Sequence, residues 1–199
     1  MTPRTALCAA LLLAALPAAA EPQRYTFDPL HTQVYFLASH LGFSHSLGKF
    51  AKFGGELAFD EDDWSTAKVD ATVDVTSLYM GDEAWEKKLL SDSFFDAKKH
   101  PTARFVAQKL VRDGTTNRGT LEGELTLHGV TRPVTFDVTV NRVGRDTYSF
   151  RHVAGFSAHA TIKRSEFGMR GSLPSVGDEV EVRLEVEAVR SKDKQRSEG

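Results

Sequence analysis

Apolar and polar residues alternate along two neighbouring stretches in the middle of the chain, residues 119–127 and 134–140. A period of two is typical of β-strands that have one apolar face and one solvated face. The segment His-Gly-Val-Thr-Arg-Pro at 128–133 predicts a tight antiparallel connection between them. Such strands belong to a sheet closed around an interior rather than to a buried parallel sheet. The apolar positions are Leu121, Gly123, Leu125 and Leu127 in the first stretch, and Val134, Phe136, Val138 and Val140 in the second.

Further strand-like stretches flank this pair, and one segment changes period. Residues 84–90 fit a helix better than a strand, with Asp82 as the candidate N-cap. Asp28-Pro29-Leu30-His31 predicts a turn between the first two strands. The expected strands lie at 24–28, 32–39, 43–59, 67–76, 102–112, 119–128, 131–143, 147–164 and 178–190. About eight or nine strands with one or two short helices indicate an all-β protein, and an up-and-down barrel in particular.

The first twenty residues have the pattern of a secretory signal peptide. Arg4 precedes an apolar run from Ala6 to Leu16, and small residues follow up to Ala20. The run is shorter than the roughly 20 apolar residues that a bilayer span needs. We therefore expect residues 1–20 to be removed, together with Cys8, the single cysteine. One domain at 21–190 and a disordered tail at 191–199 are expected to remain, without a permanent membrane anchor.

The charge balance argues against one large class of partners. The chain has 25 basic and 27 acidic residues and a formal net charge of −2. Proteins that bind nucleic acids generally carry a strongly basic surface. We therefore expect no nucleic-acid partner.

Nine short motifs follow one another along the chain. They are Asp28-Pro-Leu-His31, His40-Leu-Gly42, Gly48-Lys-Phe50, Ser91-Asp-Ser-Phe94-Phe95-Asp96, Pro101-Thr-Ala-Arg-Phe105, Leu127-His-Gly129-Val-Thr-Arg-Pro133, Phe156-Ser-Ala158, Arg164-Ser-Glu-Phe167-Gly168 and Val176-Gly177-Asp178. In order and spacing they resemble the YceI-like family, over essentially the whole expected domain. One stretch departs from the pattern: many members have a basic-acidic-x-His-Leu sequence before the paired phenylalanines, where this chain has Trp85-Glu86-Lys87-Lys88-Leu89.

The resemblance implies both a fold and a function. The fold is an extended antiparallel lipocalin-like β-barrel of about eight strands with one or two short helices. The implied location is the bacterial periplasm. The implied ligand is a polyisoprenoid, an isoprenoid quinone or a related lipid, held non-covalently in the interior. The protein would act as a carrier, store or sensor of that lipid, and not as an enzyme.

Thirteen phenylalanines are many for one small domain. The interior of an eight-strand barrel either fills with such rings or leaves a slot for one ligand. The candidates for lining this slot are Phe36, Phe43, Phe50, Trp85, Phe94, Phe95, Phe105, Phe136, Phe156 and Phe167. The candidates for contacting a polar head group are His31, His40, Lys163 and Arg164. Because each buried methylene group contributes ~0.8 kcal/mol, a long apolar tail would dominate the affinity.

Two other function classes stay open as alternatives. Seven histidines allow a metal-dependent enzyme, although the chain has no His-Glu-x-x-His motif, no cysteine partner and no Gly-x-Ser-x-Gly elbow. We therefore expect neither a metal site nor catalytic residues. The other alternative is a barrel with a filled interior and a stress-related role through surface contacts. Strand edges also leave a homodimer open.

Overall fold

The β-strands of the structure follow the alternating segments of the sequence. The computed structural model describes residues 21–191. Its strands are β1 (Gln23–Phe27), β2 (Gln33–His40), β3 (Ser44–Phe50), β4 (Phe53–Phe59), β5 (Lys68–Asp74), β6 (Leu78–Tyr79), β7 (Thr102–Arg112), β8 (Arg118–Leu127), β9 (Val130–Arg145), β10 (His152–Lys163) and β11 (Val176–Arg190). The helical elements are α1 (Glu83–Leu89) and the 3-10 turns η1 (Trp64–Thr66), η2 (Val75–Ser77) and η3 (Arg164–Phe167).

Both expected terminal segments fall largely outside the described residues. The predicted signal peptide, residues 1–20, lies wholly outside them, and so do residues 192–199 of the predicted tail. Ser191, the first residue of that tail, is described. Its backbone N–H donates a hydrogen bond to the carbonyl of Arg24 at 2.8 Å.

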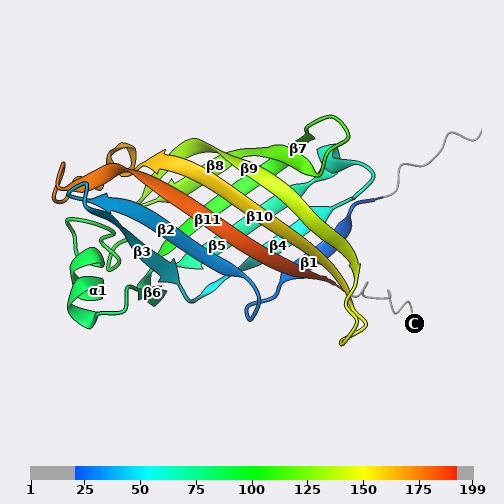
Figure 1. Cartoon of the computed structure of the whole chain (residues 1–199), viewed down its shortest axis with the longest axis horizontal. Coiled ribbons are helices and arrows are strands. Elements are labelled where there is room, and N and C mark those ends of the chain that lie inside the picture. The colour runs from blue at the N-terminus through cyan, green and yellow to red at the C-terminus, as the bar shows by residue number, and fades with distance from the viewer. Residues whose placement is uncertain (1–20, 192–199) are drawn as a thin grey trace, which may run out of the picture.

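Eight strands close into a ring, in the order β1-β4-β5-β7-β8-β9-β10-β11, because β1 pairs with β11 as well as with β4 (Figure 1). Every neighbouring pair is antiparallel. Closure leaves no free edge within the ring. The prediction of an all-β antiparallel barrel of about eight strands is confirmed.

The long strand β11 extends the barrel beyond the ring. Its C-terminal part pairs with β1, and the part from Val176 to Glu185 pairs with β2. The turn between β1 and β2, which the sequence predicts, allows β11 to pair first with one strand and then with the other. This turn is closed by a hydrogen bond from the Thr32 backbone N–H to the Asp28 carbonyl at 3.0 Å. Strands β3 and β6 continue the wall from β2, and α1 lies at this end (Figure 1). We call it the α1 end.

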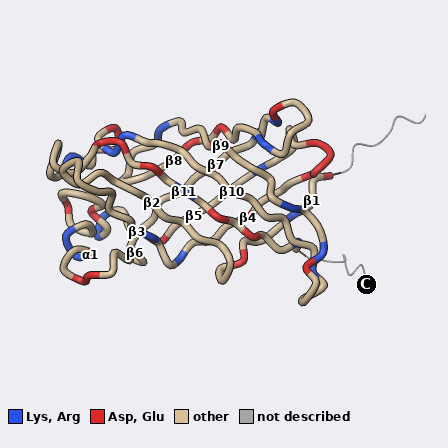
Figure 2. Tube along the Cα trace, viewed as in Figure 1, with Lys and Arg blue, Asp and Glu red and all other residues tan. Residues whose placement is uncertain are grey.

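The inner face of the wall carries the apolar half of each alternating pattern. On β9 the buried positions are Val134, Phe136 and Val138, and the residues between them are exposed. On β10 the buried positions are Ala154, Phe156, Ala160 and Ile162. On β8, Leu121 and Leu125 also pack against this core, so the period-two prediction for β8 and β9 is correct. Acidic and basic residues are interspersed along the trace (Figure 2).

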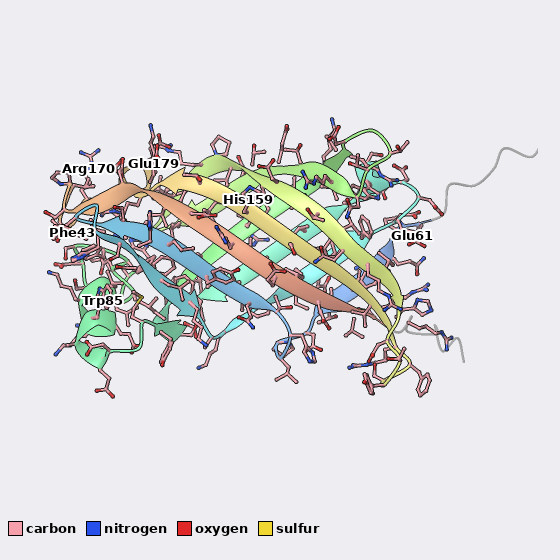
Figure 3. The ribbon with its side chains drawn as sticks, viewed as in Figure 1. Phe43, Glu61, Trp85, His159, Arg170 and Glu179 are labelled. Atoms are coloured by element: carbon pink, nitrogen blue, oxygen red, sulfur yellow. The ribbon has the colours of Figure 1, made fainter. Side chains whose placement is uncertain are left out.

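Aromatic side chains fill the barrel at the end away from α1. The Phe59 ring, 1% exposed, meets the Phe156 ring edge-on at 5.3 Å and lies 5.9 Å from the Trp64 ring. The indole N–H of Trp64 donates to the Glu61 carbonyl at 3.1 Å, and Figure 3 labels Glu61 at this end. Each such buried ring stabilises the fold by about 1.5–3 kcal/mol. These rings therefore close this end of the barrel, which we call the solid end.

The structure differs from the predicted strands at two turns. Residues 43–59, which the sequence predicts as one strand-like stretch, form the two strands β3 and β4. The turn between β3 and β4 is held by Ser77, whose hydroxyl accepts from the Lys52 backbone N–H at 2.9 Å. Residues 147–151 form a loop rather than a strand, around an Asp146 carboxylate that accepts from the Tyr148 backbone N–H at 3.1 Å.

The helix prediction is correct, with Asp82 accepting from the Trp85 backbone N–H at 2.8 Å.

Candidate functional site

Two adjoining cavities occupy the interior of the barrel. The outer chamber, beneath α1, has a volume of ≈ 300 Å³, and the inner chamber, farther along the barrel, has a volume of ≈ 170 Å³. Both exceed the roughly 150 Å³ of a dry apolar cavity that accepts a benzene-sized molecule. The residues that line both chambers are Val34, Val73, Ala103, Leu125 and Val182. Because these residues line both chambers, the two chambers adjoin within the same barrel.

A cluster of three aromatic rings forms one wall of the outer chamber. The ring centroids of Phe36 and Phe50 lie 5.7 Å apart, and the Phe95 ring meets both of them edge-on, at 6.1 and 5.7 Å. Phe36 and Phe50 come from β2 and β3, whereas Phe95 comes from the segment between α1 and β7. The chamber therefore depends on the extension of the wall beyond the eight-strand ring.

Polar groups reach the outer chamber from three sides. Lys88 on α1 and Arg164 at the start of η3 place their cationic groups 5.8 and 5.7 Å from the Phe94 ring centroid. His40, at the end of β2, also lines the chamber. The lining of the outer chamber therefore combines positive charge with an imidazole that can form hydrogen bonds.

Arg164 is buried and is held by its own loop. Its guanidinium donates to the carbonyls of Gly177, Met169 and Val176 at 2.8, 2.9 and 2.8 Å. Burial lowers the pKa of Arg164, and the charge of Asp178 opposes that change. A guanidinium stays protonated in proteins, so the group keeps its charge. Part of its donor capacity is thus used to fix the β10–β11 loop over the chamber.

The inner chamber is apolar almost throughout. The Phe105 and Phe136 rings meet edge-on at 5.0 Å, and the Phe27 and Phe53 rings lie 6.1 Å apart. Of its lining residues, the only ones with polar side chains are Thr32, Thr72 and Arg104. The Arg104 guanidinium pairs with an exposed Asp70 carboxylate at 2.8 Å, outside the barrel. The chamber can therefore hold an apolar group but offers little for a polar one.

The structure brings eight of the ten candidate aromatic residues to the two chambers. Those that line the outer chamber are Phe36, Phe50, Trp85, Phe94 and Phe95. Those that line the inner chamber are Phe105, Phe136 and Phe156. Phe167, 1% exposed, is packed in the core and lines neither chamber.

The placement of Phe43 in the interior is wrong. Its side chain is 88% exposed and lies at the tip of the α1 end (Figure 3). The chain turns just before Phe43, at Leu41 and Gly42, which have positive φ angles of 53° and 74°. The turn is closed by a hydrogen bond from the Phe43 backbone N–H to the His40 carbonyl at 3.0 Å. It reverses the chain before Phe43 and directs the ring outward.

The four predicted head-group residues do not form one site. His40 and Arg164 line the outer chamber, but Lys163 is exposed on the outer side, because successive side chains of a strand point to opposite faces. His31 is exposed in the β1–β2 turn, 3.0 Å from the Asp28 carboxylate. The hydrogen bond to Asp28 raises the pKa of His31. The prediction that Lys163 and His31 contact the head group is therefore wrong for a ligand in the outer chamber, since neither residue lines it.

Sequence reasoning missed two features at the α1 end. Lys88 lines the outer chamber, and the departure of residues 85–89 from the family pattern was the signal that could have found it. Asp96, His100 and His128 form a second feature, because each offers a potential metal-binding atom and these atoms lie within 4.8 Å of one another.

Within the part of the chain that the structure describes, no helix is long and apolar enough to cross a membrane.

Comparisons with known proteins agree with this architecture. The model of the YceI-like domain matches residues 25–188. A UPF0312 protein of Pectobacterium atrosepticum is 34% identical over 182 residues, which cover 92% of this chain and 93% of that protein. Among solved structures, BcnA of Burkholderia cenocepacia has a TM-score of 0.74 at 27% identity, over 81% of this chain and 98% of BcnA.

A more distant structure shares the fold. A polyisoprenoid binding domain from Saccharophagus degradans has a TM-score of 0.63 at 15% identity, over 84% of this chain and 98% of that domain. The family model and the curated relative both extend over nearly the entire described barrel. The chain therefore belongs to the YceI-like family.

Proposed function

We propose that this protein binds one long apolar lipid of the polyisoprenoid or isoprenoid-quinone type in its two chambers and carries it in the periplasm. The observation that carries the proposal is the pair of adjoining apolar chambers inside the barrel. An apolar chain that fills both chambers gains ~0.8 kcal/mol for each buried methylene group. Burial of the tail would then supply most of the binding free energy, and polar contacts would add little to it.

The polar residues in the lining of the outer chamber favour a particular orientation of the ligand. Lys88, Arg164 and His40 supply positive charge and hydrogen bonds there, whereas the inner chamber is apolar. A lipid would therefore enter tail first and leave an acceptor or anionic head group beside these residues. The residues we assign to the tail are Phe36, Phe50, Trp85, Phe94, Phe95, Phe105, Phe136 and Phe156.

Two further observations support the proposal. The structurally similar domain from Saccharophagus degradans is described as polyisoprenoid binding. The pattern of residues 1–20 fits export from the cytoplasm, and a carrier of apolar lipids is needed where they must cross an aqueous compartment. Two hollow chambers also favour lipid binding over the alternative of a filled barrel. We assign the barrel a binding role and not a catalytic one.

The proposal is tested by native mass spectrometry of the protein purified from its own periplasm without detergent, with organic extraction of the same sample. We expect a discrete added mass that is removed by the organic solvent. Chromatography of the extract then identifies the lipid. A bare polypeptide mass with no apolar extract, and no uptake of an added polyisoprenoid by the same sample, would overturn the proposal.

A further inference from the structure

Three potential metal ligands converge beside the outer chamber. They are the Asp96 carboxylate and the imidazoles of His100 and His128, whose potential ligand atoms all lie within 4.8 Å of one another. The two imidazole ring centroids are 4.9 Å apart. Metal–ligand bonds of about 2.1 Å place the donors of a tetrahedral site about 3.4 Å apart. Small side-chain rotations are enough to bring these atoms to that spacing.

The hydrogen bonding of His128 leaves one ring nitrogen ready for a metal. Its Nδ1 lies 2.9 Å from the Phe167 carbonyl oxygen. A carbonyl only accepts hydrogen bonds, so Nδ1 carries the proton and Nε2 of the neutral ring has a free lone pair. Nε2 is buried and has no hydrogen-bond partner among the described residues. A ligating histidine typically has this arrangement, with its second nitrogen donating to a backbone carbonyl.

Local backbone structure holds the other two ligands in place. Asp96 and His100 share one turn, in which the His100 backbone N–H donates to the Asp96 carbonyl at 2.9 Å. The His100 ring packs against Gly129, where a Cβ atom would come within 2.6 Å of the ring. Gly129 also has a positive φ of 74°, which completes the two-residue turn with His128 between β8 and β9. The turn that presents His128 therefore also makes room for His100.

We propose that Asp96, His100 and His128 bind a divalent first-row transition-metal ion, for which Zn²⁺ is the natural probe. Two imidazoles and one carboxylate are a ligand set that such ions favour over Mg²⁺ or Ca²⁺. The Lys99 ammonium contacts one Asp96 oxygen at 2.9 Å, but a carboxylate has about four lone-pair sites and can serve both groups. An aspartate carboxylate is ordinarily ionised at neutral pH, so this ligand carries a negative charge for the metal.

A metal at this site would act as a clamp at the α1 end. Asp96 and His100 belong to the segment between α1 and β7, whereas His128 belongs to the β8–β9 turn. Neither histidine lines the outer chamber, so the ion would lie beside the lipid and not within its path. Binding would join the segment that carries Phe94 and Phe95 to the barrel. The site is independent of the lipid-binding proposal.

The test uses purified protein treated with a chelator and then titrated with Co²⁺, followed by displacement with Zn²⁺. Visible absorption reports the Co²⁺ ligand field, and calorimetry gives the stoichiometry. Two variants remove ligands but suit the backbone: His128→Asn places Asn-Gly, the preferred pair, in the turn, and Asp96→Asn keeps a residue that tolerates the positive φ of 42° at this position. His159→Ala is the matched control, because His159 is exposed on the outer face of β10 (Figure 3).

We expect one ion per chain, and a melting temperature that rises with Zn²⁺ because the metal binds only the folded state. His128→Asn and Asp96→Asn should weaken binding at least tenfold and abolish the Zn²⁺-dependent rise in melting temperature, while His159→Ala should change neither. The proposal is overturned if the unaltered protein shows no saturable binding in a large excess of metal. It is equally overturned if His128→Asn leaves the Co²⁺ spectrum and affinity unchanged.

Discussion

Ala103 lies where the two chambers meet, so a larger side chain there should separate them. Ala103 lines both chambers and pairs with Val73 across β7 and β5. The change Ala103→Phe puts a ring into existing empty space, which limits the strain that overpacking normally produces. We expect this ring to close the inner chamber to a ligand that enters from the α1 end.

The volume of the inner chamber sets the size of the effect. Since an apolar cavity of about 150 Å³ holds a benzene-sized ligand, the ≈ 170 Å³ of the inner chamber holds roughly six carbon atoms of a chain. At ~0.8 kcal/mol for each buried methylene group, their exclusion weakens binding by about 5 kcal/mol, a factor of roughly 10³ to 10⁴ in Kd. A short ligand that fits within the outer chamber should bind with unchanged affinity.

The assay compares two isoprenoid alcohols of different length on lipid-stripped protein. Calorimetry or fluorescence gives both affinities for the unaltered protein and for Ala103→Phe. Thr102→Phe is the matched control, because it adds the same ring to an exposed position on the same strand. Circular dichroism confirms that each variant is folded. Equal losses for the long and short ligands, or no loss for the long one, would refute the two-chamber reasoning.

Three further predictions concern stability and the corrected residues. Phe43→Ser should leave lipid retention unchanged and alter the free energy of unfolding by no more than about 0.5 kcal/mol, as measured by denaturant titration, because the ring is 88% exposed; a loss of bound lipid would contradict its outward placement. Phe59→Ala should lower the free energy of unfolding by about 3–5 kcal/mol, since the ring is 1% exposed and packed at the solid end; a loss below 1 kcal/mol in the same measurement would argue against that packing. In an NMR titration, His31 should have a pKa above about 6.5, because Asp28 stabilises its charged form, and Asp28→Asn should bring the pKa back down. The raised pKa means that this pair stabilises the fold below about pH 6.5 and that the contribution is lost as the pH rises through the folded-state pKa of His31; an identical His31 titration curve in Asp28→Asn would exclude the pairing.

The sequence predicts the features of this fold that depend on near neighbours. The alternation on β8 and β9 and the Asp82 cap of α1 are correct because each follows from residues a few positions apart. Closure of the ring by β1 and β11 joins positions such as Tyr25 and Arg190, and no local pattern contains that pairing. The same limit explains Phe43, whose direction depends on the turn at Leu41 and Gly42.

The register of the β7–β8 pair predicts that His100 and His128 lie close together. Strands β7 and β8 pair so that Arg104 lies opposite Thr126. The start of β7 and the end of β8 therefore meet at one end of the hairpin, which places His100 beside His128. The outward direction of Lys163 follows instead from the alternation of side chains along β10, since its neighbour Ile162 is buried and faces inward. The chamber volumes could not be inferred in this way, because they depend on how side chains from many strands pack together.

The unequal packing of the two ends suggests how a lipid enters and leaves. At one end Phe59, Trp64 and Phe156 fill the barrel. At the other end α1 covers the outer chamber without any fully buried residue of its own. Segments with few buried apolar contacts open at a lower free energy than the rest of a fold. We therefore expect α1 to be displaced more easily than the strands of the ring, and its displacement would open the outer chamber. A metal ion at Asp96, His100 and His128 would restrain the segment that follows α1, and so would oppose this opening.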